Sequence, residues 1–287
     1  MRRACIDIGS NTIRLLVADC DASGLVERHR ERVFTRLGEA LGDDGAIPPD
    51  KLDEACAVVA GQLARARRFG ATEIRCVATA AVRRARNGDE LVERLRGSCG
   101  GLNIELLTAE DEARLAFRGA LRSLRGEPGE PVSVIDVGGG SSELVVGTPG
   151  QGVTWWASFP LGSSDIAHDF LTADPPSAGD VEHARERVRQ ALAGIAPPPS
   201  TSAVAIGADS LVRLVGPVLD ADAFRSSLAL LLGSSRGELA RGLGFEVERL
   251  RLLPAGLLIL EAVSKLLGTP LQIVSGGLRE GVLLDTR

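Results

Sequence analysis

The chain has 287 residues, of which 44% are hydrophobic and 25% charged, so it can bury one large core or two ordinary ones. No apolar run reaches the roughly 18 residues that cross a bilayer, and Asp7 and Gly9 interrupt the first apolar stretch too early for a signal peptide, so we expect a cytoplasmic protein. A net charge of −5 excludes a broad positive field, and the five cysteines and three histidines lack the spacing of disulfide or zinc frameworks.

Two similar segments open the two halves of the chain. Residues 5–17 read CIDIGSNTIRLLV and residues 134–146 read VIDVGGGSSELVV, so that Asp7 matches Asp136 and Arg14 matches Glu143. Each β-branched run ends in Asp-x-Gly and is followed by a second apolar run, which predicts a β-hairpin with a glycine-bearing loop. The repeat indicates two similar domains, which we place at 1–125 and 126–287.

Helices and strands follow each hairpin. In the first half we expect a helix over 48–70, a strand over 73–78, a helix over 89–96, a strand over 104–107, a helix over 108–124 and a linker over 125–131. In the second half we expect hairpins to about 158, helices near 163–171 and 177–194, a strand over 203–206, helices to about 267, a strand over 271–274 and a final helix from Leu278. This order predicts two α/β domains facing a common cleft, with one Asp-x-Gly loop of each domain pointing into it.

The two glycine loops are candidate phosphate-binding sites. Glycine accepts positive φ and lets a ligand approach the backbone, so successive N–H groups and hydroxyls can converge on one phosphate. The candidates are Gly9, Ser10, Asn11 and Thr12 in the first loop and Gly138, Gly139, Gly140, Ser141 and Ser142 in the second. One such loop is weak evidence because tight turns are common, but two at matched positions are stronger.

Three carboxylates are candidates for catalysis. Asp136 and Glu143 flank the second loop, and together they suit Mg²⁺, although Glu143 alone could be an exposed residue of an edge strand. Thr108 and Asp111 have the spacing of a capping box that begins a helix. Glu112 follows at the edge of the apolar stripe of that helix, where a partly buried carboxylate can act as a general base.

These motifs resemble those of the exopolyphosphatase and guanosine pentaphosphate phosphohydrolase family (Ppx/GppA), a branch of the sugar kinase, Hsp70 and actin superfamily. The resemblance covers the segments 6–17, 35–41, 78–87, 110–121, 134–146, 158–164, 251–260 and 275–284. It implies two ribonuclease H-like (actin-like ATPase) domains, with Glu112 as the catalytic base. It further implies that Glu143 positions metal and water, that Asp136 binds Mg²⁺ and that Arg83 contacts phosphate.

The chain departs from the family pattern at Arg84, Asp165 and Arg251 and in the loop IGADS (206–210). Asp165 and Arg251 reverse the expected charges, which predicts an ion pair between them. The loop IGADS does not resemble the GxxGT-like loop of sugar kinases or Hsp70-like ATPases, which argues against an ATPase. These departures concern the affinity for substrate and the specificity more than hydrolysis.

The predicted activity is Mg²⁺-dependent release of orthophosphate from the end of inorganic polyphosphate by attack of water. Hydrolysis of the 5′ terminal phosphate of guanosine pentaphosphate needs the same residues and stays open, as does a non-catalytic sensor of polyphosphate or alarmone. A pocket that stacks on a base needs aromatic rings, but the chain has no tyrosine, and its two tryptophans at 155 and 156 are adjacent. Alternation on a strand would bury one of them, which favours a substrate without a base. The expected partners are inorganic polyphosphate or (p)ppGpp, with no nucleic acid and no membrane, and the chain could form a homodimer.

Overall fold

The computed structural model describes residues 1–21, 24–42, 44–124, 130–207 and 209–285. The chain divides into two compact units: Met1–Arg122 with the segment that begins at Gly276, and Ser123–Ser275. The C-terminal segment, which the predicted range 126–287 assigned to the second domain, thus belongs to the first unit. The reason is that helix α11 (Leu278–Leu284) buries Val282 and Leu283 in the core of that unit.

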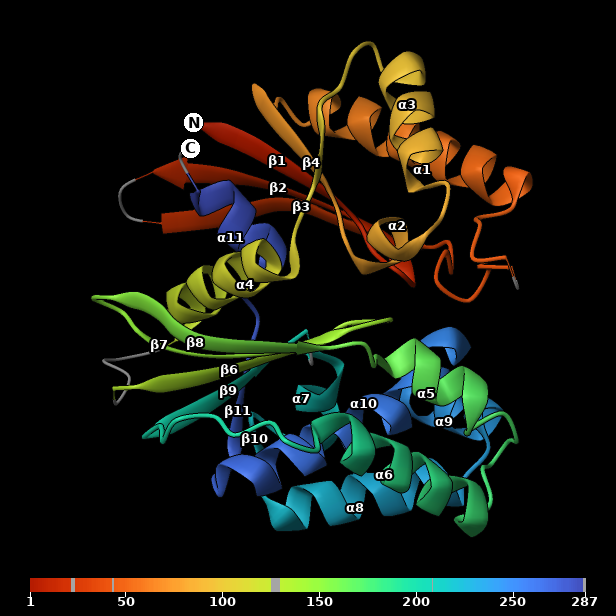
Figure 1. Ribbon diagram of the computed structural model, residues 1–287, viewed down its shortest axis with the longest axis vertical. Helices are drawn as coiled ribbons and strands as arrows, with labels where there is room; N and C mark the ends of the chain where they lie inside the picture. Colours follow the sequence, from red (N-terminus) through yellow and green to blue (C-terminus); the bar gives the residue numbers. More distant parts are fainter. Residues whose placement is uncertain (22–23, 43, 125–129, 208, 286–287) are drawn as a thin grey trace. The chain divides into compact units, whose positions relative to one another are not determined.

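The first unit is built on a five-stranded sheet with the order β3-β2-β1-β4-β5 (Figure 1). Its strands are β1 (Arg2–Ile8), β2 (Thr12–Asp21), β3 (Gly24–Phe34), β4 (Glu73–Ala78) and β5 (Ile104–Leu106). The first three strands are antiparallel, whereas β4 and β5 continue the sheet in the parallel sense. The helices of this unit, besides α11, are α1 (Pro49–Arg68), α2 (Ala80–Arg84), α3 (Gly88–Ser98) and α4 (Ala109–Ser123).

Alternate residues of β1 and β2 face two different layers of helices. Ile6 and Ile13 belong to a core that includes Leu52 of α1. Cys5, one position from Ile6, and Leu16, three positions from Ile13, belong to the opposite core with α11. The strand period of two therefore assigns every residue of this hairpin to the side of α1 or to the side of α11.

The second unit contains a six-stranded sheet with the order β10-β11-β9-β6-β7-β8. Its strands are β6 (Val132–Val137), β7 (Ser142–Thr148), β8 (Gly152–Phe159), β9 (Ser202–Ile206), β10 (Val218–Leu219) and β11 (Leu271–Val274). Starting from β8, the order is third, second, first, fourth and fifth strand, as in the first unit, with β10 added at the edge. The structure therefore supports the duplication that the repeat indicates.

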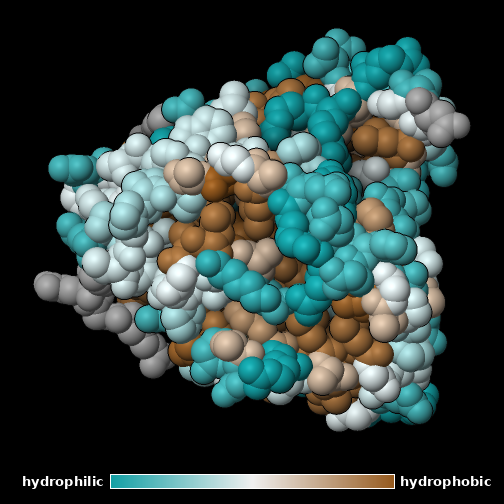
Figure 2. All heavy atoms as spheres, turned by 60° about the horizontal axis from the view of Figure 1, so that its bottom comes forward, coloured by the Kyte–Doolittle hydropathy of each residue, from teal (hydrophilic) through white to brown (hydrophobic). Residues whose placement is uncertain are grey.

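The helices in the described residues of the second unit are α5 (Ser163–Asp169), α6 (Ala178–Leu192), α7 (Asp209–Val215), α8 (Ala221–Gly233), α9 (Arg236–Leu243) and α10 (Val247–Leu267). The long helix α10 is its apolar centre and packs against α5, α6, α8 and α9. Hydrophobic side chains reach the surface between hydrophilic ones on the face shown in Figure 2. None of the helices in the described part of the chain is long and apolar enough to cross a membrane.

The α/β class, the two hairpins and the predicted strands 73–78 and 271–274 are confirmed. Three elements were not predicted, namely β3, α2 and the two-residue strand β10. The predicted linker lies mostly outside the described residues, as does part of the loop 206–210.

Candidate active site

The first glycine loop joins β1 to β2 and is fixed by backbone hydrogen bonds. The N–H of Gly9 donates to the carbonyl of Thr12 over 3.0 Å, which closes the turn. The carbonyl of Asn11 accepts hydrogen bonds from the N–H groups of Thr35 and Arg36, and that of Ser10 accepts one from Gly38. The Oδ1 atom of Asn11 is buried and has no hydrogen-bond partner within the described residues, which is unusual for a buried acceptor. The loop is thus preformed and carries an unsatisfied polar atom.

A pair of opposite charges lies directly below this loop on the α11 side of the sheet. Asp7 is opposite Arg14 in the register of β1 and β2. Burial raises the pKa of Asp7 above its ordinary value of 3.8, while the charges of Arg14 and Arg279 lower it. The Nε atom of Arg14 donates to the hydroxyl of Thr12 over 2.8 Å, so that the guanidinium is tied to the loop. The repeat had matched these positions to Asp136 and Glu143, but neither Asp7 nor Arg14 was predicted to belong to the site.

The structure brings Glu112 and Arg83 together. Glu112 lies in the first turn of α4 and is 7% exposed, which confirms that it turns toward the interior. The capping-box spacing gives a side-chain cap, because the N–H of Asp111 donates to the hydroxyl of Thr108 over 3.1 Å and that hydroxyl donates to Oδ2 of Asp111 over 2.8 Å. Arg83, at the end of α2, forms an ion pair with Glu112 and donates to the carbonyl of Leu107 over 2.7 Å. The pair holds the carboxylate of Glu112 in a defined position.

The second glycine loop joins β6 to β7 and has the same closing bond. The N–H of Gly138 donates to the carbonyl of Ser141 over 3.0 Å. The loop rests against the start of α5, because the N–H of Ser164 donates to the carbonyl of Gly139 over 2.9 Å. A Cβ atom at Gly162 would lie 2.1 Å from the carbonyl carbon of Gly139, so the contact requires glycine. The loop and the beginning of α5 are therefore one packed unit.

Ser141 and Ser142, two predicted phosphate contacts of this loop, are both buried. The hydroxyl of Ser142 donates to the carbonyl of Leu161 over 2.8 Å. Ser141 is 7% exposed and lies one residue closer to the glycines. In this structure Ser142 supports the loop, and the backbone of residues 138–141 is the part that a ligand could approach.

Asp136 and Glu143 are directly opposite each other on β6 and β7. Glu143 is 4% exposed, and the hydroxyl of Ser158 donates to its Oε1 atom over 2.9 Å. Like charges at directly opposed positions of two strands repel, and a cation between them removes the repulsion. Carboxylate oxygens are the ligands that Mg²⁺ prefers, so the pair fits this ion. No group of three or more metal-binding side chains is found in the described part of the chain, so water and phosphate would supply the other ligands.

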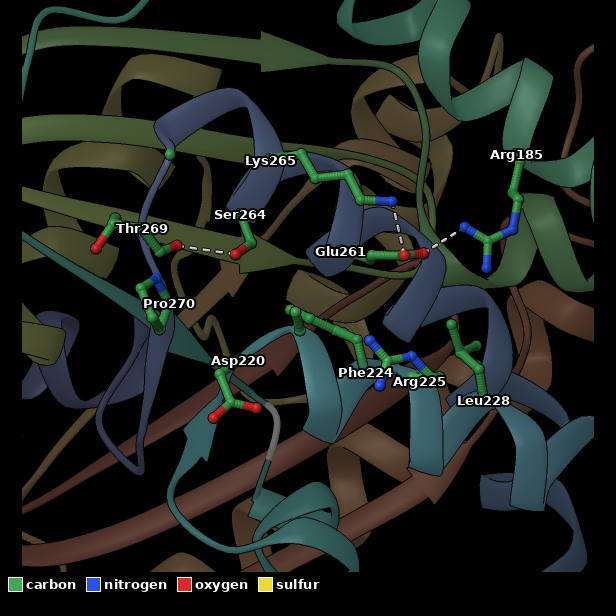
Figure 3. Close-up of a pocket in the computed structure, with 12 residues that line it drawn as sticks. Arg185, Asp220, Phe224, Arg225, Leu228, Glu261, Ser264, Lys265, Thr269 and Pro270 are labelled. Carbon is green, nitrogen blue, oxygen red and sulfur yellow. Dashed lines mark hydrogen bonds and ion pairs between the residues drawn. The ribbon is translucent and has the colours of Figure 1, made fainter.

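A separate pocket of about 570 Å³ lies among α6, α8 and the end of α10 and contains none of the predicted site residues. Figure 3 shows Arg185 and Lys265 directed toward Glu261 at its rim. Burial raises the pKa of Glu261, but the hydrogen bonds from Lys265 and Arg185 lower it more, so the carboxylate is balanced by its neighbours. Arg185, Lys265 and Glu261 thus form ion pairs with one another.

A sequence profile of the Ppx/GppA phosphatase family matches residues 16–287. The chain belongs to the Ppx/GppA phosphatase family. Exopolyphosphatase 2 of Mycobacterium tuberculosis is 34% identical over 199 residues, which are 67% of this chain and 61% of the relative. Exopolyphosphatase 1 of the same species is 29% identical over 308 residues, which are 99% of this chain and 88% of the relative.

Solved structures of the Ppx/GppA family show the same fold. The Aquifex aeolicus family member superposes with a TM-score of 0.82 at 29% identity and covers 99% of this chain and 96% of that chain. An exopolyphosphatase from Cytophaga hutchinsonii gives a TM-score of 0.88 at 22% identity, with coverage of 99% and 97%, and supports the fold alone. The predicted two-domain actin-like fold is confirmed. The chain spans about three fifths of the length of the curated relatives that are 34% identical to it.

The departures from the Ppx/GppA pattern have local partners in the structure. The side chain of Asp165 accepts a hydrogen bond from the N–H of Gly162 over 2.9 Å at the start of α5. Arg251 pairs with Glu248 at 2.9 Å within α10. The ion pair between Asp165 and Arg251 stays a prediction.

Proposed function

We propose that the chain is an exopolyphosphatase that releases orthophosphate from the end of inorganic polyphosphate in a Mg²⁺-dependent attack of water. The observation that carries the proposal is the second hairpin, where a preformed glycine loop lies beside the directly opposed carboxylates Asp136 and Glu143. The names of the Mycobacterium tuberculosis relatives, both exopolyphosphatases, support polyphosphate as the substrate. The five cysteines are free thiols, which supports a cytoplasmic location.

In the proposed reaction each group acts on a stated atom. Glu112, positioned by Arg83, accepts a proton from the attacking water, and the new bond to the terminal phosphorus forms as the anhydride bond to the next phosphate breaks. The backbone N–H groups of the two loops bind the phosphate oxygens. Asp136 and Glu143 would hold Mg²⁺, which supplies positive charge to the phosphate oxygens.

Replacing Glu112 with glutamine tests the base. Glutamine keeps the shape of the side chain and cannot accept the proton, so kcat should fall by a factor on the order of 10² to 10⁴ with little change in KM. Phosphate release should be measured from polyphosphate, guanosine pentaphosphate and ATP, each with and without Mg²⁺. Near-normal hydrolysis by Glu112→Gln would refute the assignment, and an unmodified protein that hydrolyses none of the three substrates would favour the sensor.

Guanosine pentaphosphate is the second candidate, and one observation favours it. Trp156 is 38% exposed and lies opposite Val145, whereas Ser158, two positions along β8, lies opposite Glu143. The strand period places Trp156 on the same face of the sheet as the carboxylate pair, where its ring could stack on a guanine base.

A Trp156→Ala variant separates the two substrates. If the base stacks on this ring, the variant should lose about tenfold or more in kcat/KM for guanosine pentaphosphate and change little for polyphosphate. Equal effects on both substrates, or none, would exclude the stacking role and favour polyphosphate. The matched control is Trp155→Ala, because the strand period turns the neighbouring ring to the other face.

A further inference from the structure

Arg279, in the first turn of α11, has no role in the mechanism above. It is partly buried, and within the described residues of the first unit it makes no hydrogen bond and no ion pair shorter than 4.0 Å. The adjacent Glu280 is fully engaged, because it accepts hydrogen bonds from Arg30 over 2.9 Å and from the N–H of Gly277 over 3.0 Å. No nitrogen atom of Arg279 is among the fully buried side-chain atoms without a partner, so the guanidinium still reaches the surface and can donate to a ligand.

Helical spacing places Arg279 over the sheet. Residues at i, i+3 and i+4 share one face of a helix, so Arg279 lies on the same face as Val282 and Leu283. Those two side chains pack on Cys5 and Leu16, which are opposite each other in the register of β1 and β2. Arg279 is one turn nearer the start of the helix and therefore covers a different pair of strand residues.

That pair is Asp7 and Arg14. They lie two positions further along the strands on the same face as Cys5 and Leu16, and they are the last such pair before the loop 9–12. The electrostatics agree with this placement, since burial and the charge of Arg14 lower the pKa of Arg279, while Glu280 and Asp7 raise it. Arg30 and Glu280 also act on Arg279, but they pair with each other at 2.9 Å. The guanidinium groups of Arg14 and Arg279 with the single carboxylate of Asp7 therefore leave an excess of positive charge beside the loop.

We propose that Arg279, together with Arg14, binds a phosphate group of the substrate next to the loop 9–12. A phosphate can accept two parallel hydrogen bonds from a guanidinium and supplies the negative charge that the cluster lacks. The cations of the pocket in Figure 3 differ in that Arg185 and Lys265 each form an ion pair with Glu261, whereas Arg279 forms none shorter than 4.0 Å within the described residues of its unit. The inference depends on the proposed function only in that the ligand is a chain of phosphates.

The test compares thermal stability with and without tripolyphosphate. The ligand should raise the Tm of the unmodified protein, because it binds the folded state. Arg279→Met should unfold at the same temperature as the unmodified protein or above it, since a poorly compensated charge is removed, yet it should lose most of the ligand-induced shift. KM for tripolyphosphate should rise about 10- to 100-fold, as for the loss of a hydrogen bond to a charged group, with a smaller change in kcat. Arg279→Lys should retain part of both effects.

Arg118→Met is the matched control, because Arg118 lies in the same unit and forms a 2.6 Å ion pair with Asp285. This variant should lower the Tm and keep the ligand-induced shift. A lower Tm with an unchanged shift in Arg279→Met would show a structural role and overturn the proposal, as would the absence of any shift in the unmodified protein. A shift that depends on Arg279, in a protein that hydrolyses no polyphosphate, would uphold the subsite and reject the proposed activity.

Discussion

The hairpins β1–β2 and β6–β7 have the same backbone design and opposite electrostatics. Both loops close with a hydrogen bond from glycine, at Gly9 and Gly138, and both place an aspartate at the end of the first strand. The residue across from that aspartate is Arg14 in one copy and Glu143 in the other. In the proposed function, this one difference in charge separates a hairpin that binds an anion from a hairpin that binds a cation.

The partners of the two loops differ in the same way. Behind the first loop, Arg279 adds a second positive charge to the cluster that contains Asp7 and Arg14. Behind the second loop, Ser158 donates a hydrogen bond to Glu143, whose strand position is opposite that of Asp136. Under the proposed function, the side chains of the first hairpin bind phosphate and those of the second bind Mg²⁺, and each variant below alters one side of this contrast.

The largest effect is expected at the position where the charge differs. Glu143→Gln removes one carboxylate from the proposed Mg²⁺ pair, so activity at limiting Mg²⁺ should fall by about 10- to 100-fold or more and recover in part at high Mg²⁺. Arg14→Gln, the matched change in the first hairpin, should raise KM and leave the Mg²⁺ requirement unchanged. Steady-state rates over a Mg²⁺ titration measure both. The same Mg²⁺ dependence in the two variants would contradict the division of roles.

A second contrast concerns Gly162 and Gly38, the glycines that pack against the second and the first loop. A Cβ atom at Gly162 would meet the backbone of Gly139 at 2.1 Å, whereas one at Gly38 would meet the Cβ atom of Ser10 at 3.0 Å. Overpacking against a backbone costs about 1–3 kcal/mol or more, and about 1 kcal/mol shifts the Tm by roughly 2–4 °C in a domain of this size. Gly162→Ala should therefore lower the Tm by several degrees and Gly38→Ala by much less. Equal shifts in calorimetry would show that the two loops are packed alike.

The sequence predicts the frame of both hairpins because their apolar residues alternate with the period of a strand and recur in the second half. It does not predict β3, where Glu27, Arg28, Arg30, Glu31 and Arg32 are charged, since an edge strand with few apolar residues has little periodicity. It does not predict α2 either, because five residues are too short for a helical pattern.

The candidate site is predicted in part for a similar reason. The burial of Glu112 follows from its place beside an apolar stripe, which is local information. The ion pair of Glu112 with Arg83 and the approach of Arg279 to Asp7 join residues far apart in the chain, and no periodicity encodes such contacts. The signal that could have indicated Arg14 was present in the repeat, where a cation replaces an acid at a matched position.

The smallest expected effect is a pH-dependent difference in stability that should appear at Asp7 and not at Asp136. Because burial raises the pKa of Asp7 above 3.8, the folded protein favours its protonated form, and the stability that this form contributes is complete below pH 3.8 and is lost as the pH rises through the raised pKa. Asp7→Asn cannot ionise, so it should exceed the unmodified protein in stability at pH 7 by on the order of 1 kcal/mol. The difference should shrink as the pH approaches 3.8 from above.

Urea unfolding at several pH values measures it, with Asp136→Asn as the control, whose stability should instead become insensitive to Mg²⁺. If the difference in stability between Asp7→Asn and the unmodified protein does not change with pH, Asp7 stays ionised beside Arg14 and Arg279 throughout the range. Its carboxylate would then offset part of the positive charge of the first hairpin at every pH, which would weaken the contrast with the second hairpin.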